Sequence, residues 1–229
     1  EDDLKATEVT LRWPAGETAT EIILTPGDIR HAIKAEEIAA GAAKITGLNS
    51  ETAYTAKMMN GTKTRGTIAF KTLVDFGGAT PVYKEDDLKA LLDNAEEGAA
   101  FILVEGEFII DDYKLTKSVK ISGFKPTSKP TIKGRFTVAS AVASLTLSNV
   151  IIDGNKEIAN FLELTDAAGN LGALSLDGCE ILNMTKHIIY NNKKGTFGTI
   201  AIDNCIIDGI ANDQGDGFDL RGGDLTSLS

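Results

Sequence analysis

The chain has 229 residues, which is enough for two modest domains because single domains usually run from roughly 100 to 200 residues. Its 33 Asp and Glu residues outnumber its 23 Lys and Arg residues and give a net charge of −10. This charge repels phosphate backbones and anionic lipid, so we expect no nucleic-acid partner. The longest apolar run, Ala99–Val104, is far shorter than the roughly 20 residues that cross a bilayer, so we expect no transmembrane segment.

Short alternating segments separated by turns occupy the first third of the chain. In Glu8–Trp13, the apolar residues Val9, Leu11 and Trp13 alternate with polar ones, as in a half-buried antiparallel strand. Similar segments follow at 21–24, 30–35, 42–46, 53–59 and 67–71. This spacing predicts an all-β sandwich.

Two aromatic residues connect this sandwich to a known family. Tyr54 opens an alternating strand and follows Leu48 by six residues, while Trp13 lies late in an early strand. The arrangement resembles the tyrosine corner of fibronectin type III domains, in which the phenol closes the bend between two strands. The resemblance predicts a fibronectin type III-like β-sandwich over residues 1–73 and implies a spacer in a secreted or surface protein.

A domain boundary follows the sandwich, because Gly77, Gly78 and Pro81 interrupt the strand pattern. We therefore assign residues 74–84 to a linker and residues 85–229 to a second domain.

The second domain is predicted to begin with one short amphipathic helix. Within Asp86–Ala95, one helical face carries the apolar side chains of Leu88, Leu91, Leu92 and Ala95. The apolar strand Phe101–Val104 follows. This order resembles the start of pectin-lyase-like β-helices, where a short N-terminal helix caps the open end of the solenoid.

Internal repetition supports that resemblance. Three apolar segments align with one another: Leu145–Gly154, Leu174–Asn183 and Ile200–Gly209. Their starts are 29 and 26 residues apart, and such a period indicates a solenoid in which each unit buries its apolar face on its neighbours. A second strand recurs between them at Phe161–Leu164, Ile188–Asn191 and Phe218–Arg221. We predict a right-handed parallel β-helix.

A leucine-rich repeat is the alternative fold. The residues that fit its consensus are Leu171, Leu174, Leu176, Cys179 and Ile181. The second half of each unit, however, is rich in β-formers and lacks a helical pattern. This difference favours the β-helix.

The repeat also places the two cysteines. Val150, Cys179 and Cys205 hold the same inward position in successive coils, about 4.8 Å apart by strand spacing. We expect a buried ladder with free thiols, because in-register side chains rarely reach the disulfide torsion. Leu228 follows Ile200 by 28 residues, so we expect the β-helix to be incomplete at its C-terminus.

Polar residues in the second strands form a candidate binding site. We predict six inward residues: Leu162, Leu164, Ile188, Tyr190, Phe218 and Leu220. Alternation then sends two columns outward: Glu163, Ile189 and Asp219, and next to them Thr165, Asn191 and Arg221. The candidate glycan-binding face consists of Glu163, His187, Asn191, Lys193, Asp219 and Arg221.

The pectin-lyase-like resemblance implies that polysaccharides bind on this outward face. A lyase there needs a cation, or calcium held by carboxylates, and a base. We expect no resident metal or other cofactor. Calcium is the one candidate, and Asp216 and Asp219, together with Glu163, are the carboxylates that could hold it. Arg221, Lys193 or His187 could serve as the base, although any solvated solenoid face carries such residues.

The order of the two modules resembles bacterial secreted or surface-anchored proteins. It implies an extracellular, periplasmic or cell-surface location and a polysaccharide or surface glycan as partner. Three functions stay open: non-catalytic polysaccharide binding or display, which we favour; a fragment of a lyase or hydrolase acting on uronate-containing glycans; and an adhesin or protein-binding scaffold.

Overall fold

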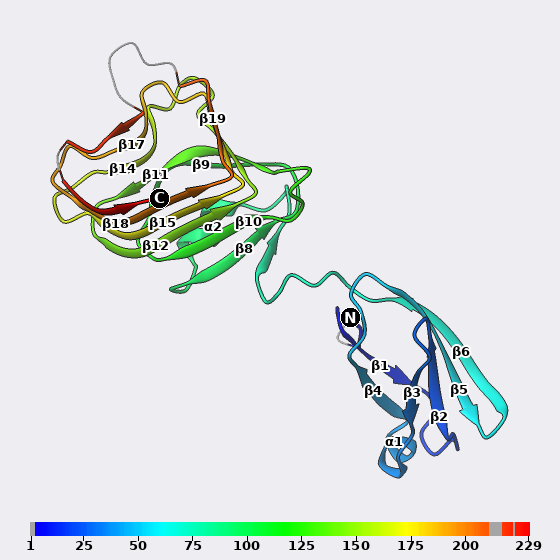
Figure 1. The fold of residues 1–229 in the computed structure, drawn as a ribbon. Helices are drawn as coiled ribbons and strands as arrows, with labels where there is room; N and C mark the ends of the chain where they lie inside the picture. The colour runs from blue at the N-terminus through cyan, green and yellow to red at the C-terminus, as the bar shows by residue number, and fades with distance from the viewer. Residues whose placement is uncertain (1–2, 211–216, 222) are drawn as a thin grey trace. The chain divides into compact units, whose positions relative to one another are not determined.

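The computed structural model describes residues 3–210, 217–221 and 223–229. Strands account for 52% of the described residues and helices for 5%, which confirms the all-β prediction. The chain divides into two compact units, Glu1–Gly77 and Gly78–Ser229, each with its own apolar core (Figure 1). Within the described residues, no helix is both long and apolar enough to pass through a bilayer.

The first unit contains two antiparallel sheets around one core. The smaller sheet pairs β1 (Glu8–Arg12) with β4 (Ala42–Thr46). The larger has the order β3-β2-β5-β6. Its strands are β2 (Glu21–Thr25), β3 (Ile29–Ala32), β5 (Ala53–Asn60) and β6 (Lys63–Lys71). Val9 and Ile45 of the small sheet belong to the same buried cluster as Ile22 and Leu24 of the large one, so alternation placed these apolar faces correctly.

A short helix that the sequence pattern did not predict connects the two sheets. Helix α1 (Ala35–Ala40) follows β3 and ends at Gly41, whose φ is +64°. A Cβ at Gly41 would clash with the carbonyl oxygen of Trp13. Glycine is therefore required there both for the left-handed conformation and for the close approach of β1.

The tyrosine contact expected in the first unit is present. The backbone N–H of Asn49 donates a hydrogen bond to Tyr54 Oη at 3.0 Å. The Tyr54 ring stacks on Phe70 with 5.8 Å between ring centroids. Leu48 and Tyr54 are both buried, so the phenol connects the bend before β5 to the core.

The second unit begins earlier than predicted. Strand β7 (Thr80–Val82) pairs in parallel with β8 (Ala99–Leu103), and Val82 is fully buried. The assignment of the whole segment 74–84 to a linker is therefore wrong for β7. Its three residues are too short to show the alternation from which strands are predicted.

Helix α2 (Leu88–Asp93) is shorter than the predicted Asp86–Ala95. The Asp87 side chain caps its start by accepting a hydrogen bond from the backbone N–H of Ala90 at 3.0 Å. Leu88 and Leu92 are buried in the core of the second unit, as the predicted apolar face required.

Residues 107–228 form a β-solenoid of about 4 turns, which confirms the β-helix prediction at the level of the fold. One parallel sheet has the order β21-β18-β15-β12-β10-β8-β7, and the other has the order β19-β16-β13-β11-β14-β17-β20, with β9 also paired to β11. Figure 1 shows β12, β15 and β18 stacked on one side of the coil and β11, β14 and β17 on the other.

The strands of the solenoid are β9 (Glu107–Lys114), β10 (Val119–Gly123), β11 (Thr131–Val138), β12 (Ala141–Ser148), β13 (Ile151–Asp153), β14 (Asn160–Leu164), β15 (Asn170–Asp177), β16 (Glu180–Leu182), β17 (His187–Tyr190), β18 (Thr196–Asp203), β19 (Ile206–Asp208), β20 (Phe218–Asp219) and β21 (Asp224–Leu228).

The observed register agrees with the predicted repeat. Leu145 pairs with Leu174, Leu174 with Ile200, and Ile200 with Leu228. The second half of each repeat forms strands, namely β14, β17 and β20. The leucine-rich-repeat alternative is therefore excluded, because that fold has a helix or 3₁₀ segment in the second half of each repeat.

The cysteines stack as predicted. Val150 and Cys179 are fully buried and Cys205 is partly buried, and both thiols are free. Burial raises the pKa of Cys179 to about 11. The column is thus part of the apolar interior.

Candidate functional site

A polar cleft of about 410 Å³ opens beside strands β11, β14 and β17. Eight residues line it: Arg135, Ala159, Asn160, Glu163, Lys186, His187, Tyr190 and Arg221. We call this surface the polar cleft. All of these residues except Ala159 have side chains that can form hydrogen bonds.

The apolar interior determines which side chains reach the cleft. Phe136, Leu162 and Ile189 are in register across β11, β14 and β17 and are fully buried. Side chains alternate along a strand, so the next residue in each of the last two strands faces outward. These residues are Glu163 and Tyr190, which pair with each other.

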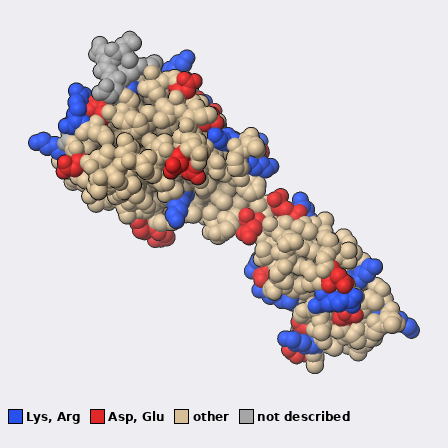
Figure 2. Space-filling model, in the orientation of Figure 1, with Lys and Arg blue, Asp and Glu red and all other residues tan. Residues whose placement is uncertain are grey.

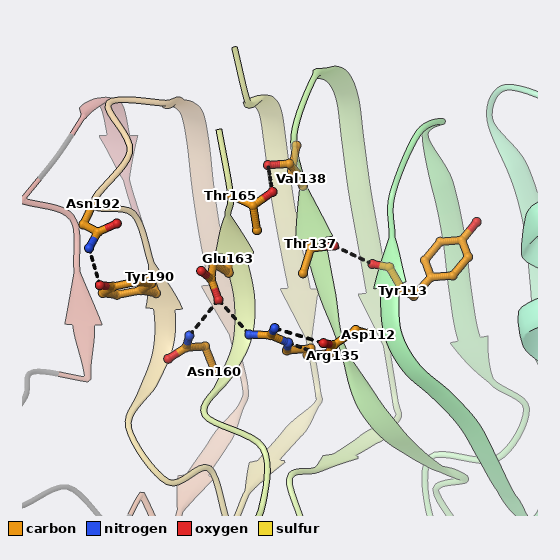
Figure 3. Close-up of polar contacts among 10 residues, drawn as sticks. All are labelled: Asp112, Tyr113, Arg135, Thr137, Val138, Asn160, Glu163, Thr165, Tyr190 and Asn192. Atoms are coloured by element: carbon orange, nitrogen blue, oxygen red, sulfur yellow. Dashed lines mark hydrogen bonds and ion pairs between the residues drawn. The ribbon is translucent and has the colours of Figure 1, made fainter. Parts of the chain in front are cut away.

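Arg135 connects three neighbouring strands through its guanidinium. Its Nη1 donates to Glu163 Oε2 at 2.7 Å, its Nη2 donates to Asp112 Oδ2 at 3.1 Å, and its Nε donates to Asp112 Oδ1 (Figure 3). The hydrogen bond with Asp112 raises the pKa of Arg135 and lowers the pKa of Asp112. The arginine is therefore firmly cationic and held between two carboxylates.

Glu163 is held through one oxygen. Besides Arg135, the Nδ2 of Asn160 donates to Glu163 Oε2 at 3.1 Å. Within the described part of the chain, Glu163 Oε1 accepts no hydrogen bond. Asn160 is 4% exposed, and its Oδ1 is buried with no hydrogen-bond partner among the described residues. The second oxygen of Glu163 is thus an available acceptor in a fixed carboxylate.

An aromatic pair forms another part of the wall. The rings of His187 and Tyr190 stack with 5.0 Å between centroids and 7° between planes. His187 is largely buried, whereas Tyr190 is partly exposed. The phenol oxygen of Tyr190 accepts a hydrogen bond from Asn192 Nδ2 (Figure 3), which fixes the ring orientation.

A second arginine is held by the last strand of this sheet. Asp219 is 2% exposed, and it accepts hydrogen bonds from Arg221 Nε at 2.8 Å and Nη2 at 2.6 Å. The hydrogen bond from Arg221 lowers the pKa of Asp219. Asp219 therefore positions Arg221 and is not itself exposed on the face.

Three of the six predicted face residues line the cleft together: Glu163, His187 and Arg221. Asn191 does not, because its side chain is fully buried and its Nδ2 donates to the Gly195 carbonyl oxygen at 2.8 Å. Lys193 is exposed in the turn after β17 and is not part of the cleft lining.

The predicted outward columns are wrong in β17. Ile189 was expected to face outward but is fully buried, and Tyr190 was expected inward but is partly exposed. The residues in register are Glu163, Tyr190 and Asp219. Asp219 was also expected to face outward but is buried. Ile188 and Ile189 are both buried, so the two-residue alternation fails there and the prediction is displaced by one residue.

The calcium prediction has little support in the described residues. Asp216 lies outside them, and Asp219 is paired with Arg221. Over the described ranges, no group of three His, Cys, Asp or Glu side chains is placed to hold a metal ion.

Sequence reasoning missed Arg135, Asn160 and Tyr190. A signal for Arg135 was present, since Phe136 precedes its partner Leu162 by 26 residues, within the period of the repeat. Extending the alignment one coil toward the N-terminus would have placed Arg135 beside the second strand of the next coil.

One family model matches residues 106–229, and its description is "Domain of unknown function (DUF4957)". The matched segment contains all of the polar cleft and more than half of the chain. No curated protein and no solved structure matches the chain. The chain therefore belongs to the DUF4957 family.

Proposed function

We propose that the second unit is a non-catalytic polysaccharide-binding domain that holds its glycan in the polar cleft. The observation that carries this proposal is the stacked pair His187 and Tyr190 beside the fixed carboxylate of Glu163. Sugar rings offer apolar C–H faces to an aromatic surface and hydroxyl groups to polar side chains. A concave site with a few fixed polar groups suits such a ligand.

The ion pairs favour binding over cleavage. A base for β-elimination must be able to take a proton from the sugar ring. Arg135 is held by Asp112 and Glu163, and Arg221 is held by Asp219. Carboxylate partners stabilise the protonated form of each guanidinium, so both arginines serve to position groups in the cleft.

The proposed setting is a secreted or cell-surface protein. The first unit has two antiparallel sheets around one core and the hydrogen bond from Asn49 to Tyr54, which supports the fibronectin type III resemblance. The solenoid, with Leu88 and Leu92 of α2 in its core, supports the pectin-lyase-like resemblance. In this account, the first unit is a spacer and α2 caps the solenoid.

Affinity gel electrophoresis tests the proposal. The full chain is run through native gels that each contain one soluble polysaccharide, and we expect at least one of them to retard it. The substitution Tyr190→Ala should abolish the retardation. Tyr83→Ala is the matched control, because Tyr83 is 43% exposed and lies outside the cleft.

Three results would contradict the proposal. Binding that survives in Tyr190→Ala would place the glycan elsewhere, and a chain that no polysaccharide retards would not be a binding domain. Release of ultraviolet-absorbing unsaturated sugar would instead show that the site is catalytic.

A further inference from the structure

We infer that the glycan of the polar cleft is a neutral polysaccharide recognised through its hydroxyl groups, rather than a uronate polymer. This inference rests on the proposed function and names the class of sugar that the same site takes. It follows from the pairing of the charged side chains, from the free oxygen of Glu163 and from the aromatic pair.

Three of the five N–H donors of the Arg135 guanidinium are bound to protein carboxylates. Its Nη1 is bound to Glu163, and its Nε and Nη2 are bound to Asp112. A sugar carboxylate is recognised best by an arginine that can present two parallel N–H groups to it. Each nitrogen of Arg135 already gives one N–H to Asp112 or Glu163, so the charge of this guanidinium is shared with two protein carboxylates before any ligand binds.

The second arginine is committed in the same way. Arg221 gives two side-chain hydrogen bonds to Asp219, which is almost fully buried. Breaking this pair would leave a buried carboxylate without its main donor, which is costly. A neutral sugar makes no such demand, because it can bind without displacing either carboxylate.

Carboxylates in and beside the cleft offset its cations. The lining contains three cations, Arg135, Lys186 and Arg221, and one carboxylate, Glu163. Asp112 and Asp219 lie outside the lining and pair with the two arginines. The whole chain carries a net charge of −10. On the face drawn in Figure 2, Lys and Arg lie scattered among Asp and Glu over the described residues. The net charge of the chain does not attract a polyanion.

Glu163 can accept a hydrogen bond from the ligand. Its Oε2 is held at 2.7 Å by Arg135 and at 3.1 Å by Asn160. Its Oε1 accepts no hydrogen bond within the described residues. An ionised carboxylate can only accept, so a sugar hydroxyl satisfies it with a charge-assisted hydrogen bond, whereas a uronate carboxylate would be repelled.

The aromatic pair supports the same class of ligand. Tyr190 stacks on His187, and the phenol oxygen is held by Asn192. The ring therefore has a fixed orientation before any ligand arrives. A pyranose can lay its C–H face against such a ring while an equatorial hydroxyl reaches Glu163, which is in the same register on the neighbouring strand.

Isothermal titration calorimetry with the full chain provides the test. The neutral probes are soluble xylan, galactomannan and β-glucan, and the anionic probes are polygalacturonate and alginate. We expect a neutral probe to bind, with an affinity that changes by less than about twofold between low and high salt, because a neutral probe carries no charge for salt to screen.

The substitution Glu163→Gln separates the two classes of ligand by the sign of its effect. It removes one negative charge but keeps an oxygen that can accept from Arg135 and Asn160. Neutral-glycan affinity should fall by at least about tenfold, as expected for loss of a charge-assisted hydrogen bond. Glu105→Gln makes the same charge change at an exposed residue outside the cleft and should have no effect.

A uronate ligand would behave in the opposite way. Polygalacturonate or alginate would bind in preference, more weakly at high salt, and Glu163→Gln would strengthen the binding. That result would overturn the neutral-sugar inference and leave the proposed function intact. Binding of neither class would overturn both.

A second variant keeps the test valid if Glu163→Gln fails to fold. Glu163→Asp retains the charge and withdraws the carboxylate by one methylene group, so it should also weaken neutral-glycan binding. An unchanged affinity in the folded Glu163→Asp variant would count against Glu163 as the acceptor and overturn the inference. Far-ultraviolet circular dichroism establishes that each variant is folded.

Discussion

Arg135 Nη1 donates a hydrogen bond to Glu163 Oε2 across 2.7 Å, from one coil of the solenoid to the next. The bond fixes one carboxylate oxygen and leaves the other without a hydrogen bond among the described residues. Asp112 holds the rest of the guanidinium. A ladder of charges thus runs across β9, β11 and β14 and supports the wall of the polar cleft.

The first prediction concerns this ladder. Arg135→Met leaves Asp112 and Glu163 without their shared cation and should lower the free energy of unfolding by about 1 to 2 kcal/mol, since the pairs are partly exposed. It should also weaken glycan binding, because Glu163 loses its anchor. Urea denaturation gives the stability change. Arg135→Lys keeps the positive charge but loses the paired N–H donors of the guanidinium, so its free energy of unfolding should lie between those of the wild type and Arg135→Met. Equal stability of all three proteins would show that these ion pairs do not stabilise the fold.

The second prediction concerns the solenoid core. Phe136 is fully buried and meets the rings of Tyr113 and Phe161 edge-on, each with 6.0 Å between centroids. Phe136→Ala should cost about 3 to 5 kcal/mol, from lost transfer energy and the cavity left behind. Phe136→Leu should cost less. Denaturant midpoints monitored by circular dichroism measure both, and a loss below about 1 kcal/mol in the alanine variant would contradict the described packing.

The third prediction concerns pH. The pKa of Asp219 is lowered in the folded chain, chiefly by its hydrogen bond with Arg221. A lowered folded-state pKa stabilises the fold above the unfolded-state value of about 3.9, and this contribution is lost as the pH falls through the folded-state pKa. Asp219→Asn lacks the contribution at every pH.

The difference in free energy of unfolding between the wild type and Asp219→Asn should therefore be largest near neutral pH. It should shrink when the pH drops below about 4. Urea titrations at several pH values measure this difference. A gap that stays constant down to strongly acidic pH would show that the pair with Arg221 does not control the ionisation of Asp219.

The fourth prediction concerns the thiols. Cys179 is fully buried, and burial raises its pKa to about 11. Because the thiolate is the reactive form, iodoacetamide at mildly alkaline pH should leave Cys179 unmodified in the folded protein. It should modify Cys179 readily in urea. Peptide mass spectrometry reads both states, and rapid labelling of native Cys179 would contradict its burial.

Apolar periodicity allowed much of the fold to be predicted. Leu145, Leu174 and Ile200 recur with the same neighbours, and the structure pairs them in register. Such columns are visible in a sequence because each coil buries the same face on the next. Apolar periodicity did not predict the short elements β7 and α1. Strand β7 has three residues, and α1 has six residues, none of them buried.

The candidate site was predicted only in part. Glu163, His187 and Arg221 line the cleft together, as expected. Tyr190 was predicted to face inward, and this was wrong because Ile188 and Ile189 are both buried and Tyr190 is partly exposed. Alternation assumes that a strand has one buried face, and it fails in β17 because the consecutive residues Ile188 and Ile189 are both buried. The pairing of Arg135 with Glu163 was missed because their contact depends on which coils are neighbours.

The most direct test of the central claim, that the polar cleft holds the glycan, is a backbone amide NMR titration. The full chain is titrated with the oligosaccharide unit of the polysaccharide that retards it most in gels. We expect chemical-shift changes concentrated on β11, β14 and β17, around Arg135, Glu163 and Tyr190. Changes confined to the first unit, or to the sheet containing β12, β15 and β18, would contradict it.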